Sequence, residues 1–577
     1  MGTGQTGSGV PPDVHDVPPD VHDVLLDVRD LTVALPEGAE RPNAVENVSL
    51  QIRKNEILCV VGESGSGKSM TAHAIMGLLP RPHVKVVGGQ ALYRGRDILA
   101  MREAEQRALR GGRLAMIFQE PMTALNPLMT VGDQIEESLK AHAVMDRAAR
   151  RARVVELLAA VGLPDPQHLR RSYPFRLSGG QRQRVMIAMA LALEPDILIA
   201  DEPTTALDVT TQKQILNLVA KIQAEREMGV MFITHDFGVV AEIATTVAVM
   251  QHGRCVEVGP AERVLNRPRH PYTRELIAAV PHYIEHRDDF VRKGEALLKT
   301  EKVSKVFRLG GFFRKGRTLV AGEDISIEIH AGETLGIVGE SGSGKSTLGR
   351  CIIGLLKADG GRILFQGRDL VTLSRRQFRP VRKDIQMIFQ DPYASLNPRH
   401  KIGDIIAQGP VAFGEGKARA LERARELLRL VGLPEAAADR YPHEFSGGQR
   451  QRISIARALA LDPKLIIADE PVSALDVSVQ RQVLDLLDDI RRRLGLAMLF
   501  ITHDLRIAAQ VCDTIAVMQK GRVVEMNTAR EVFQNPQHPY TRTLLEAIPG
   551  KGWEIPEDLR TRRVVPGAES LGQEAGA

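Results

Sequence analysis

Cysteine is scarce in this chain, and the few cysteines form no recognisable set. The 577 residues include only Cys59, Cys255, Cys351 and Cys512, which are scattered and lack the spacing of a metal site. This scatter argues against a disulfide-rich scaffold and against a zinc ribbon. We therefore interpret the four residues as buried thiols of a protein that works in a reducing compartment.

Long apolar runs and an excess of one charge are also missing. No segment approaches the roughly 18 consecutive apolar residues that a membrane-spanning helix needs, and the residues after Met1 lack the apolar core of a secretory signal. The 76 basic and 71 acidic residues give a net charge of +5, which does not favour a nucleic-acid partner. We expect a cytosolic protein, which can still dock on a membrane protein.

What the chain does contain is one set of motifs present twice. Residues 62–69 and 339–346 both read Gly-Glu-Ser-Gly-Ser-Gly-Lys-Ser. Each copy is followed, in the same order, by a glutamine, a Ser-Gly-Gly-Gln segment, an apolar run ending in Asp-Glu, and a histidine. The two motif lysines lie 277 residues apart. From the Ser-Gly-Gly segment onward, equivalent positions of the two copies lie 268 residues apart. The repeat is therefore a duplication of a whole domain.

The duplication predicts the domain organisation. Pro, Asp and His recur in the N-terminal tail, whose composition cannot form a packed core. His15 and His22 beside aspartates could bind a metal ion, although a disordered repeat is the simpler interpretation. The predicted segments are the tail at residues 1–23, a first P-loop domain at 24–283, a linker at 284–296, a second P-loop domain at 297–550, and a polar tail at 551–577.

Short apolar strands alternate with helical patterns in both halves. They are expected at residues 57–61, 196–200 and 229–233, and at 335–338, 464–468 and 497–501. Continuous apolar strands of this length are typical of a parallel sheet that is buried on both faces. Helical patterns at 148–161 and 417–431 predict a separate helical subdomain in each half. The fold class is therefore α/β, with two tandem P-loop NTPase domains that each combine a mostly parallel sheet core with a helical subdomain.

The repeated glycine-rich motif is a phosphate-binding P-loop. Its backbone N–H groups and the start of the next helix surround the β- and γ-phosphates of a nucleotide, and the lysine adds a positive charge. The serine that follows the lysine reaches Mg²⁺. The predicted ATP-binding residues are Gly62, Glu63, Ser64, Gly65, Ser66, Gly67, Lys68 and Ser69, with Gly339, Glu340, Ser341, Gly342, Ser343, Gly344, Lys345 and Ser346 in the second half.

The acidic pair at the end of the second apolar strand predicts the hydrolytic centre. Asp201 and Asp469 are expected to bind Mg²⁺, mainly through water. Glu202 and Glu470 are expected to act as general bases that orient the attacking water. Taken alone, such acids could simply cap a turn or pair with a basic side chain, and the neighbouring P-loops favour the catalytic interpretation.

Two further polar residues complete each predicted centre. Gln119 and Gln390 follow a Met-Ile-Phe run, and their amides can touch Mg²⁺ or the attacking water without being fixed there. His235 and His503 follow a third strand and can hydrogen-bond the γ-phosphate and the base. In isolation, a glutamine or histidine at a strand end is more often structural. The predicted metal set is Ser69, Gln119 and Asp201, with Ser346, Gln390 and Asp469 in the second half.

The Ser-Gly-Gly-Gln segment predicts a second anion site. A serine and two glycines that open a helix can bind a phosphate, yet the segment lies far along the chain from the P-loop of its own half. The economical hypothesis is that each segment completes the nucleotide site of the other half. The residues are Ser178, Gly179, Gly180 and Gln181, and Ser446, Gly447, Gly448 and Gln449.

The set of motifs resembles the ATP-binding cassette (ABC) ATPases. P-loop, glutamine, signature Ser-Gly-Gly-Gln, Asp-Glu strand and histidine match that family in order, over most of the chain. The resemblance implies a head-to-tail pair of cassettes with two ATP molecules between them. Lys68 would then share a nucleotide with Ser446, and Lys345 with Ser178.

A narrower resemblance lies after each cassette. The segments 269–273 and 537–541 both contain His-Pro-Tyr-Thr, which is similar to the C-terminal hallmark of oligopeptide and dipeptide importer ATPases, including fused forms of the glutathione and microcin type. This implies two transmembrane permease subunits, an extracytoplasmic solute-binding protein, and a peripheral location on the cytoplasmic face of the inner membrane. No cysteine cluster follows Thr273, so an iron–sulfur cluster is not expected.

One alternative of a different class is a soluble twin-cassette ATPase that acts on ribosomes without a membrane partner. Proteins of that kind join their cassettes by a long charged helix, whereas the linker here is short, and the His-Pro-Tyr-Thr segments have no place in them. The cargo stays open among peptides, glutathione, opines, nickel chelates and some sugars.

Overall fold

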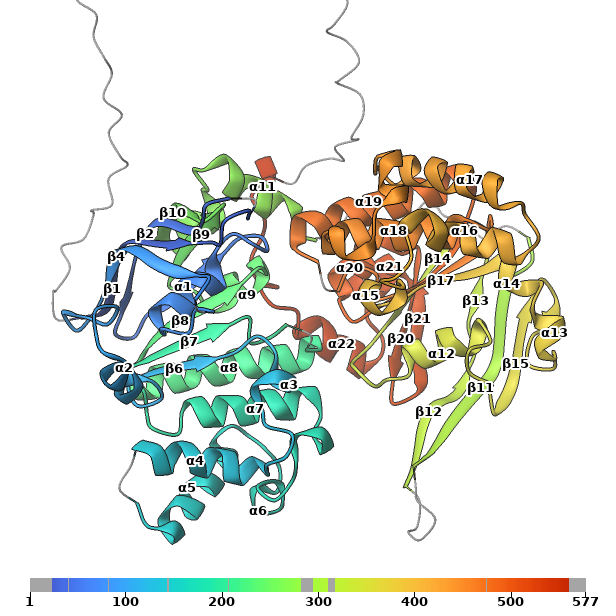
Figure 1. Ribbon diagram of the computed structural model, residues 1–577. Coiled ribbons are helices and arrows are strands. Elements are labelled where there is room, and N and C mark those ends of the chain that lie inside the picture. Colours follow the sequence, from blue (N-terminus) through green and yellow to red (C-terminus); the bar gives the residue numbers. More distant parts are fainter. Residues whose placement is uncertain are drawn as a thin grey trace, which may run out of the picture. The chain divides into compact units, whose positions relative to one another are not determined.

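The computed structural model describes residues 23–39, 41–80, 82–142, 145–205, 207–281, 294–309, 317–473 and 475–559 (Figure 1). The N-terminal repeat with His15 and His22 and most of the predicted linker lie outside these residues. The chain divides into two compact units. The first unit takes the residues up to Thr205, then Leu216–Ala278 and the residues from Trp553, while the second takes Ala206–Ile215 and Ala279–Gly552.

The first half of the chain contains two sheets. The strands of its first sheet are β1 (Val24–Ala34), β2 (Asn43–Arg53), β4 (Lys85–Tyr93) and β5 (Arg96–Asp97), in the order β2-β1-β4-β5. The strands of its second sheet, in the order β10-β9-β3-β8-β7-β6, are β3 (Ile57–Val61), β6 (Leu114–Ile117), β7 (Ile197–Asp201), β8 (Gly229–Thr234), β9 (Thr246–Gln251) and β10 (Arg254–Pro260).

Helices fill the intervals between these strands. They are α1 (Lys68–Ile75), α2 (Glu103–Leu109), α3 (Pro121–Ala124), α4 (Val131–His142), α5 (Arg147–Ala160), α6 (Pro166–Leu169), η1 (Pro174–Arg176), α7 (Gly179–Ala190), α8 (Val209–Arg226), α9 (Phe237–Ile243), α10 (Ala261–Asn266) and α11 (Pro271–Ala279). Helix α1 contacts β1 and β2 of one sheet and β7 of the other, so it lies between the two sheets.

The second sheet is the parallel core that the sequence predicts. Strands β6, β7, β8, β3 and β9 run parallel, and only β10 is antiparallel, to β9. Every residue of β3, β7 and β8 is buried, which explains their continuous apolar sequences. The first sheet is antiparallel and was not predicted. In β1, buried and less buried residues alternate with interruptions, so its period is hard to detect in the sequence.

The second half repeats this plan. Its antiparallel strands are β11 (Leu298–Leu309), β12 (Arg317–Ile325), β13 (Glu328–Ile329), β15 (Gly360–Phe365) and β16 (Arg368–Asp369). Its mostly parallel sheet has the order β17-β18-β19-β14-β20-β21, from β14 (Thr334–Val338), β17 (Ile385–Ile388), β18 (Leu465–Asp469), β19 (Ala497–Thr502), β20 (Thr514–Gln519) and β21 (Arg522–Thr528).

The helices of the second half correspond to those of the first. They are α12 (Lys345–Ile352), α13 (Arg375–Phe378), α14 (Val381–Asp384), α15 (Pro392–Ser395), α16 (Ile402–Ala412), α17 (Lys417–Leu430), η3 (Glu435–Asp439), η4 (Pro442–Glu444), α18 (Gly447–Leu459), α19 (Val477–Leu494), α20 (Leu505–Val511), α21 (Ala529–Gln534), α22 (Pro539–Glu546) and η5 (Glu557–Leu559). Figure 1 shows α4, α5 and α6 grouped at one end of the first half, and α16, α17 and α18 grouped in the second. These groups match the predicted helical subdomains.

The end of the described chain packs on the first unit. The indole N–H of Trp553 donates to Oδ1 of Asn266 at 3.1 Å, and Arg274 pairs with Asp558 at 2.8 Å. Ile555 and Leu559 are buried. The sequence predicts a polar tail from residue 551, whereas these contacts make residues 553–559 part of the folded first unit.

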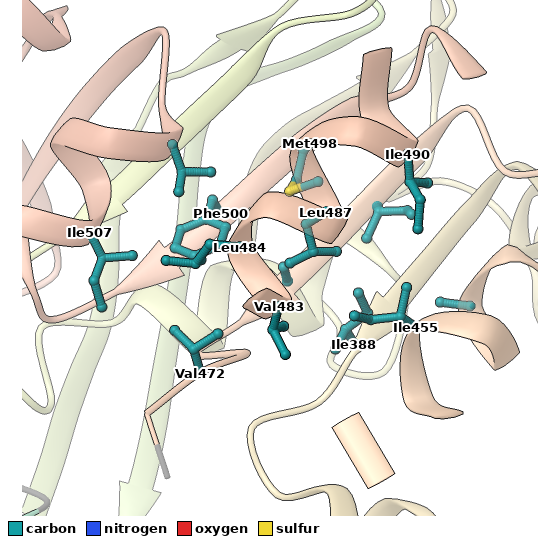
Figure 2. Close-up of a cluster of buried hydrophobic side chains, with 14 of the residues drawn as sticks. Ile388, Ile455, Val472, Val483, Leu484, Leu487, Ile490, Met498, Phe500 and Ile507 are labelled. Carbon is teal, nitrogen blue, oxygen red and sulfur yellow. The ribbon is translucent and has the colours of Figure 1, made fainter. Parts of the chain in front are cut away.

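One apolar cluster fills the second unit between its parallel sheet and the helices beside it. Figure 2 shows Val483, Leu484, Leu487 and Ile490 of α19 facing Met498 and Phe500 of β19, with Ile388, Ile455, Val472 and Ile507 around them. Phe500 is fully buried, and Leu487 is 1% exposed. The strands that carry the acidic pair and the histidine are thus anchored by dense apolar packing.

A pair of substitutions in α19 tests this packing. Leu487→Ala removes a buried side chain and should lower the free energy of unfolding by about 2–5 kcal/mol. Leu494→Ala, in the same helix at 54% exposure, should change it by no more than about 0.5 kcal/mol. Urea unfolding of the two variants measures the difference, and equal midpoints for both would contradict the described core.

Candidate functional site

The P-loop of each half connects a buried strand to a helix through a turn that only glycine can make. Gly67 has φ of 104° and Gly62 has φ of 150°. A Cβ atom on Gly62 would lie 2.2 Å from the carbonyl oxygen of Met250, and one on Gly67 would lie 2.7 Å from that of Ala44. Gly339 and Gly344 repeat both restrictions. The loop therefore wraps close to its own backbone, which leaves its N–H groups free of side-chain cover.

The P-loop lysines are buried and held by the loop itself. Lys68 is 5% exposed, and its Nζ donates to the carbonyl oxygens of Gly62 at 2.7 Å and Glu63 at 2.8 Å. Lys345 is equally buried and donates to Gly339 at 2.7 Å and Glu340 at 2.9 Å. Burial lowers the pKa of Lys345, and the nearby carboxylates of Glu470 and Asp469 oppose that shift. A further anion beside each ammonium group would be strongly favoured.

Two buried hydroxyl groups in the loops also suit a phosphate. Within the described residues, Oγ of Ser66 and Oγ of Ser343 are buried without a hydrogen-bond partner. Buried polar atoms are normally satisfied, so an unpaired pair at equivalent positions points to a ligand. Phosphate oxygens supply the acceptors that these hydroxyls lack. The residues present therefore fit the phosphates of a nucleotide.

The serine after each lysine meets the strand aspartate. Ser69 donates to Oδ1 of Asp201 at 2.9 Å, and Ser346 to Oδ1 of Asp469 at 2.7 Å. Burial raises the pKa of both aspartates, against the opposing effect of the serine hydrogen bonds. A hydroxyl and a carboxylate at this separation are hard oxygen ligands of the type that Mg²⁺ accepts. Among the described residues, no group of three His, Cys, Asp or Glu side chains forms any other metal site.

Glu202, which directly follows β7, brings together two other predicted side chains in the first half. Nε2 of Gln119 donates to Oε2 of Glu202 at 2.9 Å, and Nδ1 of His235 lies 3.4 Å from Oε1. Glu202 adopts φ of 45°, a left-handed conformation that is rare outside glycine. Strain of this kind collects at functional sites. Thr205, which the sequence analysis missed, also donates to Oε2 of Glu202 at 3.0 Å.

The second half has the same arrangement. Gln390 donates to Oε2 of Glu470 at 2.8 Å, and Nδ1 of His503 lies 3.3 Å from Oε1. Glu470 has φ of 48°. The contact with Glu470 raises the pKa of His503 against the opposing effect of burial. In both halves, therefore, the structure brings the predicted glutamine, glutamate and histidine into one cluster.

The electrostatics of Glu202 follow from its neighbours. Burial acts to raise the pKa of this carboxyl, but the hydrogen bond and positive charge of His235, with the charge of Lys68, outweigh burial and lower the pKa to about 2. In the second half, His503 and the charge of Lys345 outweigh burial in the same way and lower the pKa of Glu470. At neutral pH both side chains are carboxylates, as acceptors of a proton from water must be.

The signature segments open long helices at the surface of their own units. Ser178 is the N-cap of α7, where its Oγ accepts from the N–H of Gln181 at 3.2 Å, and the Gln181 side chain accepts from the N–H of Ser178 at 3.1 Å. Ser446 and Gln449 form the same capping box at α18. Both serines are exposed, so each helix start with its N–H groups is accessible.

A family model described as "ABC transporter" matches residues 45–205 and again residues 323–473, which is more than half of the chain. The chain belongs to the ABC transporter family. Its ABC cassettes are α/β domains of an ATP-binding, ATP-hydrolysing enzyme, which confirms the fold class and the enzyme class expected from the sequence. A second family model, "Oligopeptide/dipeptide transporter, C-terminal region", matches residues 256–318 and 524–570, after each ABC cassette.

Several curated relatives are similar over nearly their whole length. The glutathione import ATP-binding protein GsiA of Salmonella typhimurium is 48% identical, with 93% of this chain and 90% of that protein covered. GsiA of Escherichia coli K12 is also 48% identical, over 90% of this chain and 88% of that protein.

Solved structures with single ABC cassettes are similar to part of the chain. The ATP-binding cassette MJ0796, in a dimeric post-hydrolysis state with ADP and Pi, is 29% identical and covers 40% of this chain and 99% of that chain, with a TM-score of 0.37. The cbiO1 protein of Clostridium perfringens is 31% identical and covers 42% of this chain and 92% of that chain, also with a TM-score of 0.37.

The low pKa of Glu202 predicts a pH dependence of stability. A carboxyl whose pKa is depressed by folding contributes stability above its ordinary pKa, near 4.5, and this contribution is lost as the pH falls toward about 2. From pH 6 to pH 3, urea midpoints of the wild type should therefore fall more than those of Glu202→Gln. The exposed Glu275→Gln serves as control and should follow the wild type. Parallel pH profiles for wild type and Glu202→Gln would contradict the pairing.

Proposed function

We propose that this chain is the energising subunit of an ABC importer that takes up peptides or related small solutes such as glutathione. The observation that carries the proposal is the combination of two complete phosphate-binding centres with an oligopeptide/dipeptide C-terminal region after each. The relatives described above support it, since their names describe import of glutathione. No helix among the described residues has the length and apolar character needed to cross a membrane.

The proposed partners are two transmembrane permease subunits and an extracytoplasmic solute-binding protein, with the chain bound peripherally on the cytoplasmic face of the inner membrane. ATP binding would favour a closed arrangement of the cassettes, and hydrolysis would release it. A partner can shift such an equilibrium only through contacts that differ between the two states. Cargo-loaded permeases are therefore expected to change the ATPase rate.

Reconstitution tests this proposal directly. The chain is combined in proteoliposomes with the permeases and solute-binding protein that we expect neighbouring genes to encode, and ATP turnover is measured with and without peptides and glutathione. Turnover should be low for the chain alone and should rise with one of these cargoes. An ATP turnover that stays unchanged when the permeases and each cargo are added would contradict the importer assignment.

Within each cassette, the residues have separate proposed roles. Lys68 and the P-loop N–H groups would bind the β- and γ-phosphates, while Ser69, Asp201 and Gln119 would hold Mg²⁺. The ion, when bound, neutralises charge that develops on the transferred phosphoryl group. Glu202 orients the attacking water and accepts its proton. In the second cassette the same roles fall to Lys345, Ser346, Asp469, Gln390 and Glu470.

The histidine is proposed to hold the glutamate and then contact the γ-phosphate. In this structure His235 lies against Glu202, and His503 against Glu470. The left-handed backbone at each glutamate directs its side chain toward both the glutamine and the histidine. A water between glutamate and phosphate would then be positioned by groups that come from three different strand ends.

Removing both proposed bases tests this assignment. Glu202→Gln with Glu470→Gln keeps the phosphate-binding groups and removes the proton acceptors. ATP should still bind, and the hydrolysis rate should fall by about 10²–10³, as for loss of one well-placed catalytic polar group. Rapid-quench measurement of phosphate release gives the rate, and an exposed Glu275→Gln variant serves as control. A double variant with the wild-type rate would show that the base lies elsewhere.

We further propose that each signature serine serves the nucleotide of the other cassette. The supporting observation is that Ser178 and Ser446 are exposed caps of accessible helix N-termini, which are anion sites by their geometry. In this arrangement Ser446 acts on the ATP held by Lys68, and Ser178 on the ATP held by Lys345.

Coupling between substitutions separates this arrangement from its opposite. Lys68→Ala empties the first P-loop. Adding Ser446→Arg should then do little further harm, whereas adding Ser178→Arg should abolish the residual ATPase, because groups of one site couple and groups of separate sites act nearly independently. ATPase rates of the two double variants are compared. If Ser178→Arg is the silent addition instead, each cassette completes its own site.

A further inference from the structure

The segment that follows each cassette is built around one strand carboxylate. Glu257 of β10, whose side chain is 5% exposed, accepts hydrogen bonds from the backbone N–H groups of Arg269 and His270, each at 3.0 Å. In the second half, Glu525 of β21 accepts from Gln537 at 2.8 Å and from His538 at 3.0 Å. The strand thus fixes where helix α11 begins in the first half and where helix α22 begins in the second.

The histidine and proline of the segment then start that helix. Nδ1 of His270 accepts from the N–H of Tyr272 at 3.2 Å, and Nδ1 of His538 accepts from Tyr540 at 3.2 Å. Proline is the first helical residue of both α11 and α22, where its missing N–H is not needed. These constraints set the position of the tyrosine within the first turn.

The tyrosine hydroxyl reaches the P-loop of its own cassette. The N–H of Glu63 donates to the Tyr272 hydroxyl at 3.1 Å, and the N–H of Glu340 donates to the Tyr540 hydroxyl at 3.3 Å. Both tyrosines are buried, at 6% and 8% exposure. Burial raises the pKa of Tyr540 to about 12, so its hydroxyl stays neutral at physiological pH.

The glutamate that donates this hydrogen bond also accepts one from the P-loop lysine. The carbonyl oxygen of Glu63 accepts from Nζ of Lys68 at 2.8 Å, and that of Glu340 accepts from Nζ of Lys345 at 2.9 Å. The backbone of each glutamate is thus fixed on both sides, through its N–H by the tyrosine and through its carbonyl by the lysine. Losing the tyrosine hydroxyl would leave the first turn of the P-loop less constrained.

We propose that Tyr272 and Tyr540 are positioning residues for ATP, which hold each P-loop in its phosphate-binding conformation and make the segment after each cassette part of the nucleotide site. The proposal depends on ATP binding and not on the identity of the cargo. The His-Pro-Tyr-Thr segment then contributes to nucleotide binding through the hydroxyl group of its tyrosine.

The test uses Tyr272→Phe and Tyr540→Phe, singly and together, in the full-length chain. Loss of the tyrosine hydroxyl, with the hydrogen bonds it makes to the P-loop glutamate, should raise the KM for MgATP about two- to tenfold. The kcat should stay within about twofold, because these bonds position the loop rather than the reacting atoms. Tyr93→Phe is the matched control. Tyr93 is 8% exposed and donates to Asp196, away from the P-loop, so its variant should lose stability without a change in KM.

A second measurement keeps the test decisive if activity falls for other reasons. Hydrogen exchange of the peptide covering residues 57–66, without nucleotide, should be faster in Tyr272→Phe than in the wild type and unchanged in Tyr93→Phe. Residues 335–343 should respond in the same way to Tyr540→Phe. An unchanged KM together with unchanged exchange, or a drop in thermal stability alone, would overturn the proposal and leave the tyrosines with a purely structural role.

Discussion

A buried ammonium group beside a tightly turned glycine-rich loop is the constraint on which each half of this protein depends. Lys68 and Lys345 are 5% exposed, and a charge so far from water must be compensated by polar groups or by an anion. The structure supplies two carbonyl oxygens to each lysine, and carboxylates at the end of the neighbouring strand. The buried hydroxyls of Ser66 and Ser343, which have no hydrogen-bond partner, are suited to donate to phosphate oxygens.

The sheets and helices can be understood as supports for this loop. The fully buried strand β3 leads into it, and α1 leads away from it between the two sheets. The strands β7 and β8 end one residue before Glu202 and His235. Because parallel strands present their carboxyl ends at one edge, side chains far apart in sequence meet there. Apolar packing of the kind seen around Phe500 keeps those strand ends in register (Figure 2).

The parallel cores and the members of each centre could be predicted because their signals are strong and local. Continuous apolar runs marked β3, β7 and β8, and short motifs at their ends marked the polar residues that the structure brings together. The antiparallel sheet could not be predicted, because register breaks such as that between Val28 and Leu31 obscure its alternation. Tyr272 was equally out of reach, since its hydrogen bond to Glu63 joins residues 209 positions apart. Roles that depend on the nucleotide, such as those of Ser178 and Ser446, stay predictions.

The central claim is that the chain holds two nucleotides in equivalent centres. Its most direct test is the binding stoichiometry of a slowly hydrolysed ATP analogue, measured by equilibrium dialysis on the full-length protein with Mg²⁺. The matching geometry of the two P-loops predicts two molecules bound per chain at saturation. One molecule per chain would contradict the account, because it would mean that one of the two centres, despite its matching distances, does not bind nucleotide.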